Sequence, residues 1–139
     1  MNEEVARETI LEYARSSKNG ALIGAYTHRG VAENHACGDS VEFRFHIEND
    51  RIVASSFRAR GCALCTAATA ILDEHIRDAA AETVCNESRR FESILTGDPD
   101  ETWPEEFAAF RVFAAIRRNT RRRRCVLLPW EAMRAALEG

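Results

Sequence analysis

The strongest constraint on the fold is an alternating run of apolar and polar residues near the middle of the chain. Its apolar members are Val41, Phe43, Phe45 and Ile47, and one polar residue separates each from the next. Successive side chains of a β-strand point to opposite faces of a sheet, so this period predicts a strand with one buried face. Residues 48–50 are typical of a turn, which predicts that the chain returns as a hairpin.

Two further strands are expected beside this one. Residues 52–59 can return as the second strand of the hairpin, and a strand around residues 25–33 would complete a three-stranded antiparallel sheet. Ile52 lies outside the alternation of the returning strand, which leaves its register open. The alternating set in that strand is Val53, Ser55, Phe57 and Ala59.

Helical periodicity appears on both sides of these strands. Apolar residues at three- and four-residue spacing predict an amphipathic helix over residues 3–15, and alanine-rich residues 63–76 predict another. Residues 79–95 and 105–118 are expected to be further helices. Pro129 is expected in the first turn of a last helix that ends near Leu137.

Length and charge narrow the class of protein. A chain of 139 residues suits one domain, and we expect residues 1–139 to form a single one. The longest apolar run falls well short of the ~18 to 20 residues of a membrane span, and the first five residues lack the features of a signal peptide. We therefore expect a cytoplasmic protein with no membrane partner. The formal net charge of −3 provides no global positive field that would attract nucleic acid.

Five cysteines in a chain expected to meet a reducing compartment indicate metal binding or catalysis rather than structural disulfides. Cys37 and Asp39 flank Gly38, which permits a tight turn that directs both side chains to one point. The predicted hairpin brings Cys62 to the same end of the sheet, and Cys125 can join from a loop before the last helix. Three thiolates and one carboxylate suit tetrahedral zinc or an iron–sulfur site.

Taken singly, each cysteine is better explained as a small buried apolar residue than as a ligand, and Cys85 is expected to be one. The order of three segments favours the metal site. Residues 34–39 read Asn-His-Ala-Cys-Gly-Asp, residues 60–64 read Arg-Gly-Cys-Ala-Leu, and Cys125 precedes Leu-Leu-Pro-Trp. Together these segments resemble the SufU branch of the NifU N-terminal/IscU family, and the match spans most of the chain.

That resemblance implies an α+β fold, in which about five to six helices pack on a three-stranded antiparallel sheet with a metal site at one end. It also implies zinc binding by Cys37, Asp39, Cys62 and Cys125, with Cys37 as persulfide acceptor. The implied partners are a pyridoxal-phosphate cysteine desulfurase and a downstream sulfur or cluster acceptor. The protein would then be sulfurtransferase-like rather than a stand-alone enzyme. The alternative within the family is a scaffold that holds a transient iron–sulfur cluster on the same four residues.

Four positions near these segments carry open alternatives. His35 stands where the family usually has proline, and it is interpreted as a loop histidine, a partner of a ligand or a replacement ligand. Arg124 stands where IscU proteins carry a ligand-like histidine, which favours zinc transfer over a scaffold, and Arg122 fits the family's basic position. Cys65 forms a Cys-x-x-Cys pair with Cys62, so it is a buried small residue, a fourth ligand or a resolving thiol.

A hypothesis of another class rests on the run Arg117–Arg124, which has six arginines in eight positions. Under this hypothesis the chain is a zinc-stabilised nucleic-acid-binding module. The run lacks the interleaved aromatic residues on which bases stack, so nucleic acid is not the expected partner. A partner-docking patch and a solvated loop are the other interpretations. Trp103 and Trp130 are expected to be packing residues.

Overall fold

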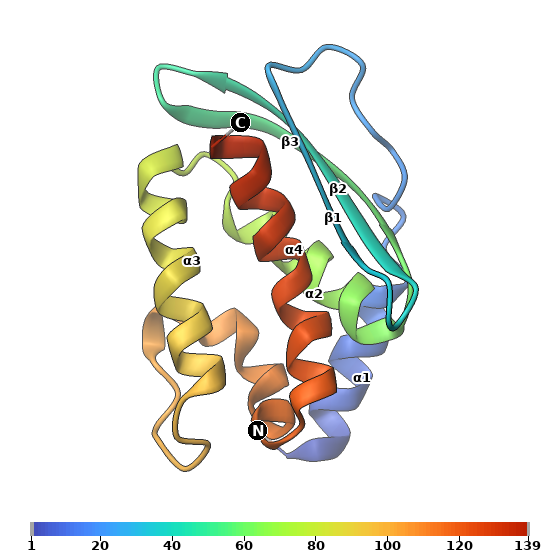
Figure 1. Cartoon of the computed structure of the whole chain (residues 1–139), viewed down its shortest axis with the longest axis vertical. Coiled ribbons are helices and arrows are strands. Elements are labelled where there is room, and N and C mark those ends of the chain that lie inside the picture. The colour runs from blue at the N-terminus through green and yellow to red at the C-terminus, as the bar shows by residue number, and fades with distance from the viewer. Residues whose placement is uncertain (1, 139) are drawn as a thin grey trace.

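The computed structural model describes residues 2–138 and confirms the α+β fold with its three-stranded antiparallel sheet (Figure 1). Within this part of the chain, no helix is both long and apolar enough to cross a membrane. The elements are, in order, α1 (Glu3–Ala14), β1 (His28–Asn34), β2 (Asp39–Glu48), β3 (Arg51–Arg60), α2 (Ala63–His75), α3 (Ala81–Thr96), the 3₁₀ helix η1 (Glu105–Arg118) and α4 (Thr120–Glu138).

The sheet has the order β1-β2-β3. Val41, Phe43 and Phe45 of β2 are completely buried, as the alternation predicts. The β2–β3 register shifts between His46 and Ile47, and this irregularity changes which residues of β3 face inward near the turn.

The alternation expected for the start of β3 is therefore wrong. Ile52 is fully buried, whereas Val53 is 42% exposed. Beyond the irregularity, Phe57 and Ala59 are buried as expected. A one-residue slip exchanges the two faces of a strand, and no residue in the sequence marks the slip.

Helices cover the face of the sheet that carries the buried residues of β2. Helices α2 and α4 pack against the strands, and α3 packs on α4 away from the sheet (Figure 1). Gly30 of β1 permits the close approach of α4, since a Cβ at this position would lie 2.3 Å from both the carbonyl oxygen of Ala132 and the amide nitrogen of Ala136. A side chain there would force α4 away from β1.

Residues 105–118 are helical as predicted, but they form a 3₁₀ helix with a break at Phe107 (φ −114°, ψ 31°). The buried residues explain this geometry, because Phe107, Phe110, Phe113 and Ile116 recur at every third position. A 3₁₀ helix has 3.0 residues per turn, so this spacing aligns the four side chains on one face.

The prediction for the last helix is wrong at its start. α4 begins at Thr120, and Pro129 lies in its interior. Proline has no N–H for the carbonyl of Cys125 four residues earlier, and an interior proline costs about 3 kcal/mol. Val126, Leu128 and Met133 are buried on the inner side of α4, and this burial offsets the cost.

Both tryptophans pack in the interior, as expected. Trp130 is 1% exposed and stacks on Phe91 of α3 with ring centroids 4.9 Å apart. The indole nitrogen of Trp103 donates a hydrogen bond to the carbonyl of Phe107 at 2.6 Å. These rings join α3, η1 and α4 into one apolar region.

Candidate metal centre

The strand pairing brings three segments to one end of the sheet. Asn34 of β1 pairs with Asp39 of β2, and Ser40 pairs with Arg60 of β3. The β1–β2 loop with Cys37 therefore lies beside the junction of β3 and α2, where Cys62 stands. This arrangement is the one the sequence predicted for the hairpin.

The loop between β1 and β2 presents Cys37 to solvent. Gly38 has a φ of +71°, a left-handed conformation that favours glycine, and the Cys37 amide donates a hydrogen bond to the carbonyl of Asn34 at 3.2 Å. The Cys37 residue is exposed. A thiol at the tip of so short a loop is held in place and stays accessible.

Asp39 is the buried member of the site, at 2% exposure. One of its carboxylate oxygens accepts a hydrogen bond from the backbone amide of Cys62 at 3.0 Å, and the other lies 3.9 Å from the Cys62 sulfur. Cys62 is also the N-cap of α2. The carboxylate is thus fixed at a helix N-terminus, where a negative charge is favourable.

Gly61 makes this contact possible. Its φ is +141°, and a Cβ there would lie 1.9 Å from the Asp39 oxygen. A larger residue would displace the Asp39 side chain. In the sequence, Gly61 stands out only as part of the family segment, whereas the structure shows that it leaves room for the Asp39 carboxylate.

Cys125 comes from a helix and not from the loop that the sequence predicted. It lies inside α4 and is 5% exposed, and its sulfur is 3.7 Å from the carbonyl of Arg121. Burial raises the pKa of the Cys125 thiol, and the neighbouring Cys62 and Asp39 raise it further. A proton or a metal cation would relieve the repulsion among these donors.

Three donor atoms of the candidate centre lie close enough together to hold a metal ion. One donor atom each of Cys37, Asp39 and Cys125 lies within 4.8 Å of the other two, and Cys62 contacts Asp39. Tetrahedral zinc with thiolate ligands at ~2.3 Å separates its donors by about 3.8 Å, so a contraction of at most roughly 1 Å would bring these three donors to the spacing that zinc requires. Among residues 2–138, no other group of histidine, cysteine and acidic side chains meets this distance criterion.

The two remaining cysteines lie outside this cluster. Cys65 is fully buried, and its backbone amide donates to the sulfur of Cys62 at 3.4 Å. Burial, with smaller contributions from Asp39 and Cys62, raises the pKa of the Cys65 thiol to about 12, so it stays protonated at neutral pH. Cys85 on α3 is half-buried rather than a core residue, because the buried face of α3 is formed by Val84, Ser88, Phe91 and Leu95.

His35, Arg122 and Arg124 are all exposed and lie within three residues of Cys37 or Cys125 in the chain. The His35 side chain is 89% exposed and lies 3.4 Å from Glu33, so its ring points to solvent. Arg122 and Arg124 are exposed on the first turns of α4. Neither guanidinium has a hydrogen-bond partner within residues 2–138.

The run Arg117–Arg124 is not the loop that one interpretation required. Arg117 is 3% exposed, donates to three backbone carbonyls and lies 5.0 Å from the Trp103 ring. Arg118 pairs with Asp100. The run is therefore split between the end of η1 and the start of α4, and part of it is structural.

Comparisons with known proteins identify the family of this chain. The profile of the family described as NifU-like N terminal domain matches residues 5–138. The iron–sulfur cluster assembly scaffold protein IscU of Thermotoga maritima is 24% identical over 132 residues, which cover 94% of this chain and 91% of that protein. The zinc-dependent sulfurtransferase SufU of Bacillus subtilis is 19% identical over 128 residues, or 91% of this chain and 85% of that protein.

Solved structures share the fold. A crystal structure from Fervidobacterium islandicum, of a protein proposed there to be an iron–sulfur cluster assembly scaffold for the SUF system, has a TM-score of 0.85. It is 26% identical, and the match covers 94% of each chain. The N-terminal part of a NifU-like protein from Brucella abortus is 16% identical, has a TM-score of 0.82 and shows the same fold. The chain therefore belongs to the family of NifU-like N-terminal domains.

Proposed function

We propose that this protein accepts sulfur from a pyridoxal-phosphate cysteine desulfurase and passes it toward iron–sulfur cluster assembly, with zinc bound at the candidate centre. The observation that carries the proposal is that Cys37 and Asp39 of one segment lie close to Cys62 and Cys125 of two others at one end of the sheet. The zinc-dependent name of the SufU relative supports the choice of metal.

Cys37 is the proposed acceptor because it combines exposure with a fixed position. It lies at the tip of the β1–β2 loop, whereas Asp39 and Cys125 are buried. A protein partner can therefore bring a persulfide to Cys37 without opening the core. Cys62 is exposed as well, but its sulfur accepts the Cys65 amide as the cap of α2.

The transfer step needs no oxidant. The Cys37 thiolate attacks the outer sulfur of the persulfide on the desulfurase, a new S–S bond forms at Cys37, and the original S–S bond breaks. The electron pair of the broken bond leaves with the desulfurase cysteine, which departs as a thiolate. Bound zinc would supply the charge that keeps the cysteines deprotonated before transfer.

Each residue of the centre then has a separate role. Asp39 is the hardest donor of the four and the weakest match for zinc, so it is the proposed ligand that exchanges. Cys62 and Cys125 are held by α2 and α4 and would retain the metal. The downstream acceptor takes the sulfur from Cys37. We place this work in the cytoplasm, with residues 1–139 as one domain.

The second candidate is a scaffold on which an iron–sulfur cluster is assembled. The scaffold name of the Thermotoga maritima relative favours it. Arg124 at the position before Cys125 argues for zinc transfer, because a guanidinium cannot act as a ligand. Metal analysis of anaerobically purified protein separates the two: one colourless zinc supports transfer, and a brown chromophore supports the scaffold.

The test of the proposed function compares the cysteines. Cys37→Ala, Cys62→Ala and Cys125→Ala should each lower the zinc content and abolish stimulation of the desulfurase. Cys85→Ala is the matched control and should change neither. Zinc loss in the control alone would overturn the assignment, and so would full stimulation by Cys37→Ala.

A further inference from the structure

The outer face of the sheet, opposite the helices, is covered over only part of its length. The coil between α1 and β1 crosses this face, where the amide of Ile23 donates to the Ser56 hydroxyl at 3.0 Å and its carbonyl accepts from Arg44 at 3.2 Å. Asn19 bonds the backbone of Ala59 along the edge of β3. The part of the outer face nearest the metal centre lies beyond the Ile23 contacts, and Asn19 borders it at the edge of β3.

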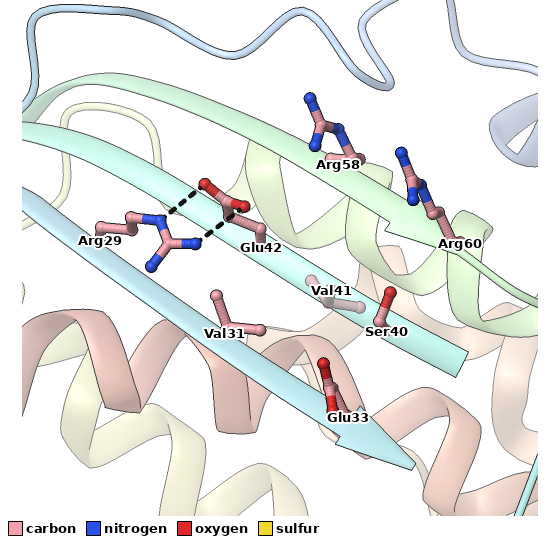
Figure 2. A pocket seen from close by; sticks show the side chains of 8 residues that line it. All are labelled: Arg29, Val31, Glu33, Ser40, Val41, Glu42, Arg58 and Arg60. Carbon is pink, nitrogen blue, oxygen red and sulfur yellow. Dashed lines mark hydrogen bonds and ion pairs between the residues drawn. The ribbon is translucent and has the colours of Figure 1, made fainter. Parts of the chain in front are cut away.

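This open part forms a shallow groove of about 200 Å³. Val31 and Glu33 of β1 line one side, and Arg58 and Arg60 project from β3 on the other (Figure 2). Arg60 immediately precedes Gly61 and Cys62 in the chain. The groove therefore ends beside the thiols of the candidate centre.

The two arginines of β3 have free charges. Glu42 lies opposite Arg58 in the strand register, but its carboxylate is bonded to Arg29 at 2.9 and 3.3 Å and to Arg44 at 2.8 Å. Arg60 lies opposite Ser40, which carries no charge. Within residues 2–138, neither Arg58 nor Arg60 has an ion pair or a side-chain hydrogen bond.

We propose that Arg58 and Arg60 dock an extended acidic segment of the protein that donates sulfur, an inference that rests on the proposed function. Residues two apart on a strand lie on the same face about 6.5 Å from each other. Two carboxylates at alternate positions of an extended segment have the same spacing, so each can pair with one guanidinium. Val31, 38% exposed in the same groove, offers apolar contact beside these two carboxylates.

Charge complementarity favours an acidic protein segment over nucleic acid. Glu33 lies in the same groove with a half-exposed carboxylate, and the chain has a formal net charge of −3. A polyphosphate backbone spans many charges and would meet these acidic groups, whereas a short acidic segment needs only the two arginines. Docking here would hold the donor beside the end of the sheet that carries Cys37.

The test is the double variant Arg58→Glu/Arg60→Glu in the full chain. Its matched control is Arg7→Glu/Arg111→Glu, which makes the same charge change at two exposed arginines outside the groove. Calorimetry with the purified cysteine desulfurase measures Kd at two salt concentrations. We expect the groove variant to bind about 10- to 100-fold more weakly, with a smaller salt dependence, and the control to bind within about threefold of the original chain.

Zinc content and the thermal midpoint of both variants show that the fold and the centre are intact. Equal binding by the groove variant and the original chain overturns the docking inference alone, provided that the original chain accepts sulfur. Equal weakening in the control also overturns it, because net charge would then explain the effect. Failure of the original chain to bind the desulfurase overturns the proposed function, and the inference with it. Loss of duplex RNA binding in the groove variant, with desulfurase binding unchanged, assigns the groove to nucleic acid and overturns the acidic-segment assignment.

Discussion

Two regions of the molecule meet along α4 and differ in what holds them together. The aromatic region, defined here as Phe91, Phe107, Phe110 and Trp130, is built from large side chains that are at most 1% exposed, and Trp130 comes from α4. The candidate metal centre is built from small polar donors, and α4 contributes Cys125. Five positions along one helix therefore separate the two regions.

The difference lies in the source of the stabilising free energy. Phe91, Phe107, Phe110 and Trp130 gain it from apolar area removed from water and from ring contacts such as the 4.9 Å stack. Asp39 and Cys125 are buried donors that gain little in this way and repel one another when ionised. The turns at Gly38 and Gly61 hold Asp39 instead, and helix α4 holds Cys125. Substitutions should therefore divide into those that change stability and those that change the centre.

The largest effect is expected in the aromatic region. Phe91→Ala removes a fully buried ring that contacts Trp103, Phe107, Phe110 and Trp130, and it should lower the free energy of unfolding by about 3–5 kcal/mol. Denaturant unfolding measures this change. The zinc affinity of the folded variant should stay within about threefold, because no residue of the centre contacts the ring.

Val53→Ala is the control for that measurement. Val53 is 42% exposed on the sheet, so the free energy of unfolding should change by no more than about 0.5 kcal/mol. A folded Phe91→Ala protein that has lost its zinc affinity would show that the two regions are coupled through α4. The two regions could then no longer be treated as independent.

An intermediate effect is expected at Gly61. Gly61→Ala places a Cβ 1.9 Å from the Asp39 oxygen and forces alanine into a φ of +141°. Strain of this kind costs about 1–3 kcal/mol of stability, and it also moves the adjacent Cys62, one of the thiolates proposed to retain the metal, so zinc binding should weaken by about 10- to 100-fold. Chelator competition and denaturant unfolding measure the two effects. Gly24→Ala is the control, since a Cβ there meets no atom within 4 Å.

Much of the sheet and the site's location follow from local pattern. The alternation of Val41, Phe43 and Phe45 fixes β2, and hairpin geometry then brings Asp39 and Cys62 to one end. The fold was predictable because strand period and turn position depend on neighbouring residues. The register slip near Ile52 left no local signal, and the Ile52 backbone there bonds Asp78 and Ala79, which are distant in the sequence.

The errors in the last third of the chain have the same origin. Pro129 was interpreted as a helix start because local preference places proline in the first turn, but burial of the inner side of α4 carries the helix through it. Cys125 accordingly reaches the centre from a helix. The 3₁₀ geometry of η1 did have a signal, because Phe107, Phe110, Phe113 and Ile116 repeat at every third position. Tertiary packing therefore set the course of α4, which local residue preference alone does not predict.

The smallest effect, and the most specific, is expected at Asp39, where Asp39→Asn and Asp39→Ala separate two uses of one side chain. Asparagine keeps an oxygen for the Cys62 amide, so its free energy of unfolding should stay within about 0.5 kcal/mol, while alanine loses that bond and about 1 kcal/mol. Both variants lack the anionic ligand that tempers metal binding, so the three remaining thiolates should release zinc to a chelator more slowly and desulfurase stimulation should fall. Normal stimulation by Asp39→Asn would reduce Asp39 to a structural cap of the Cys62 amide and remove it from the ligand set.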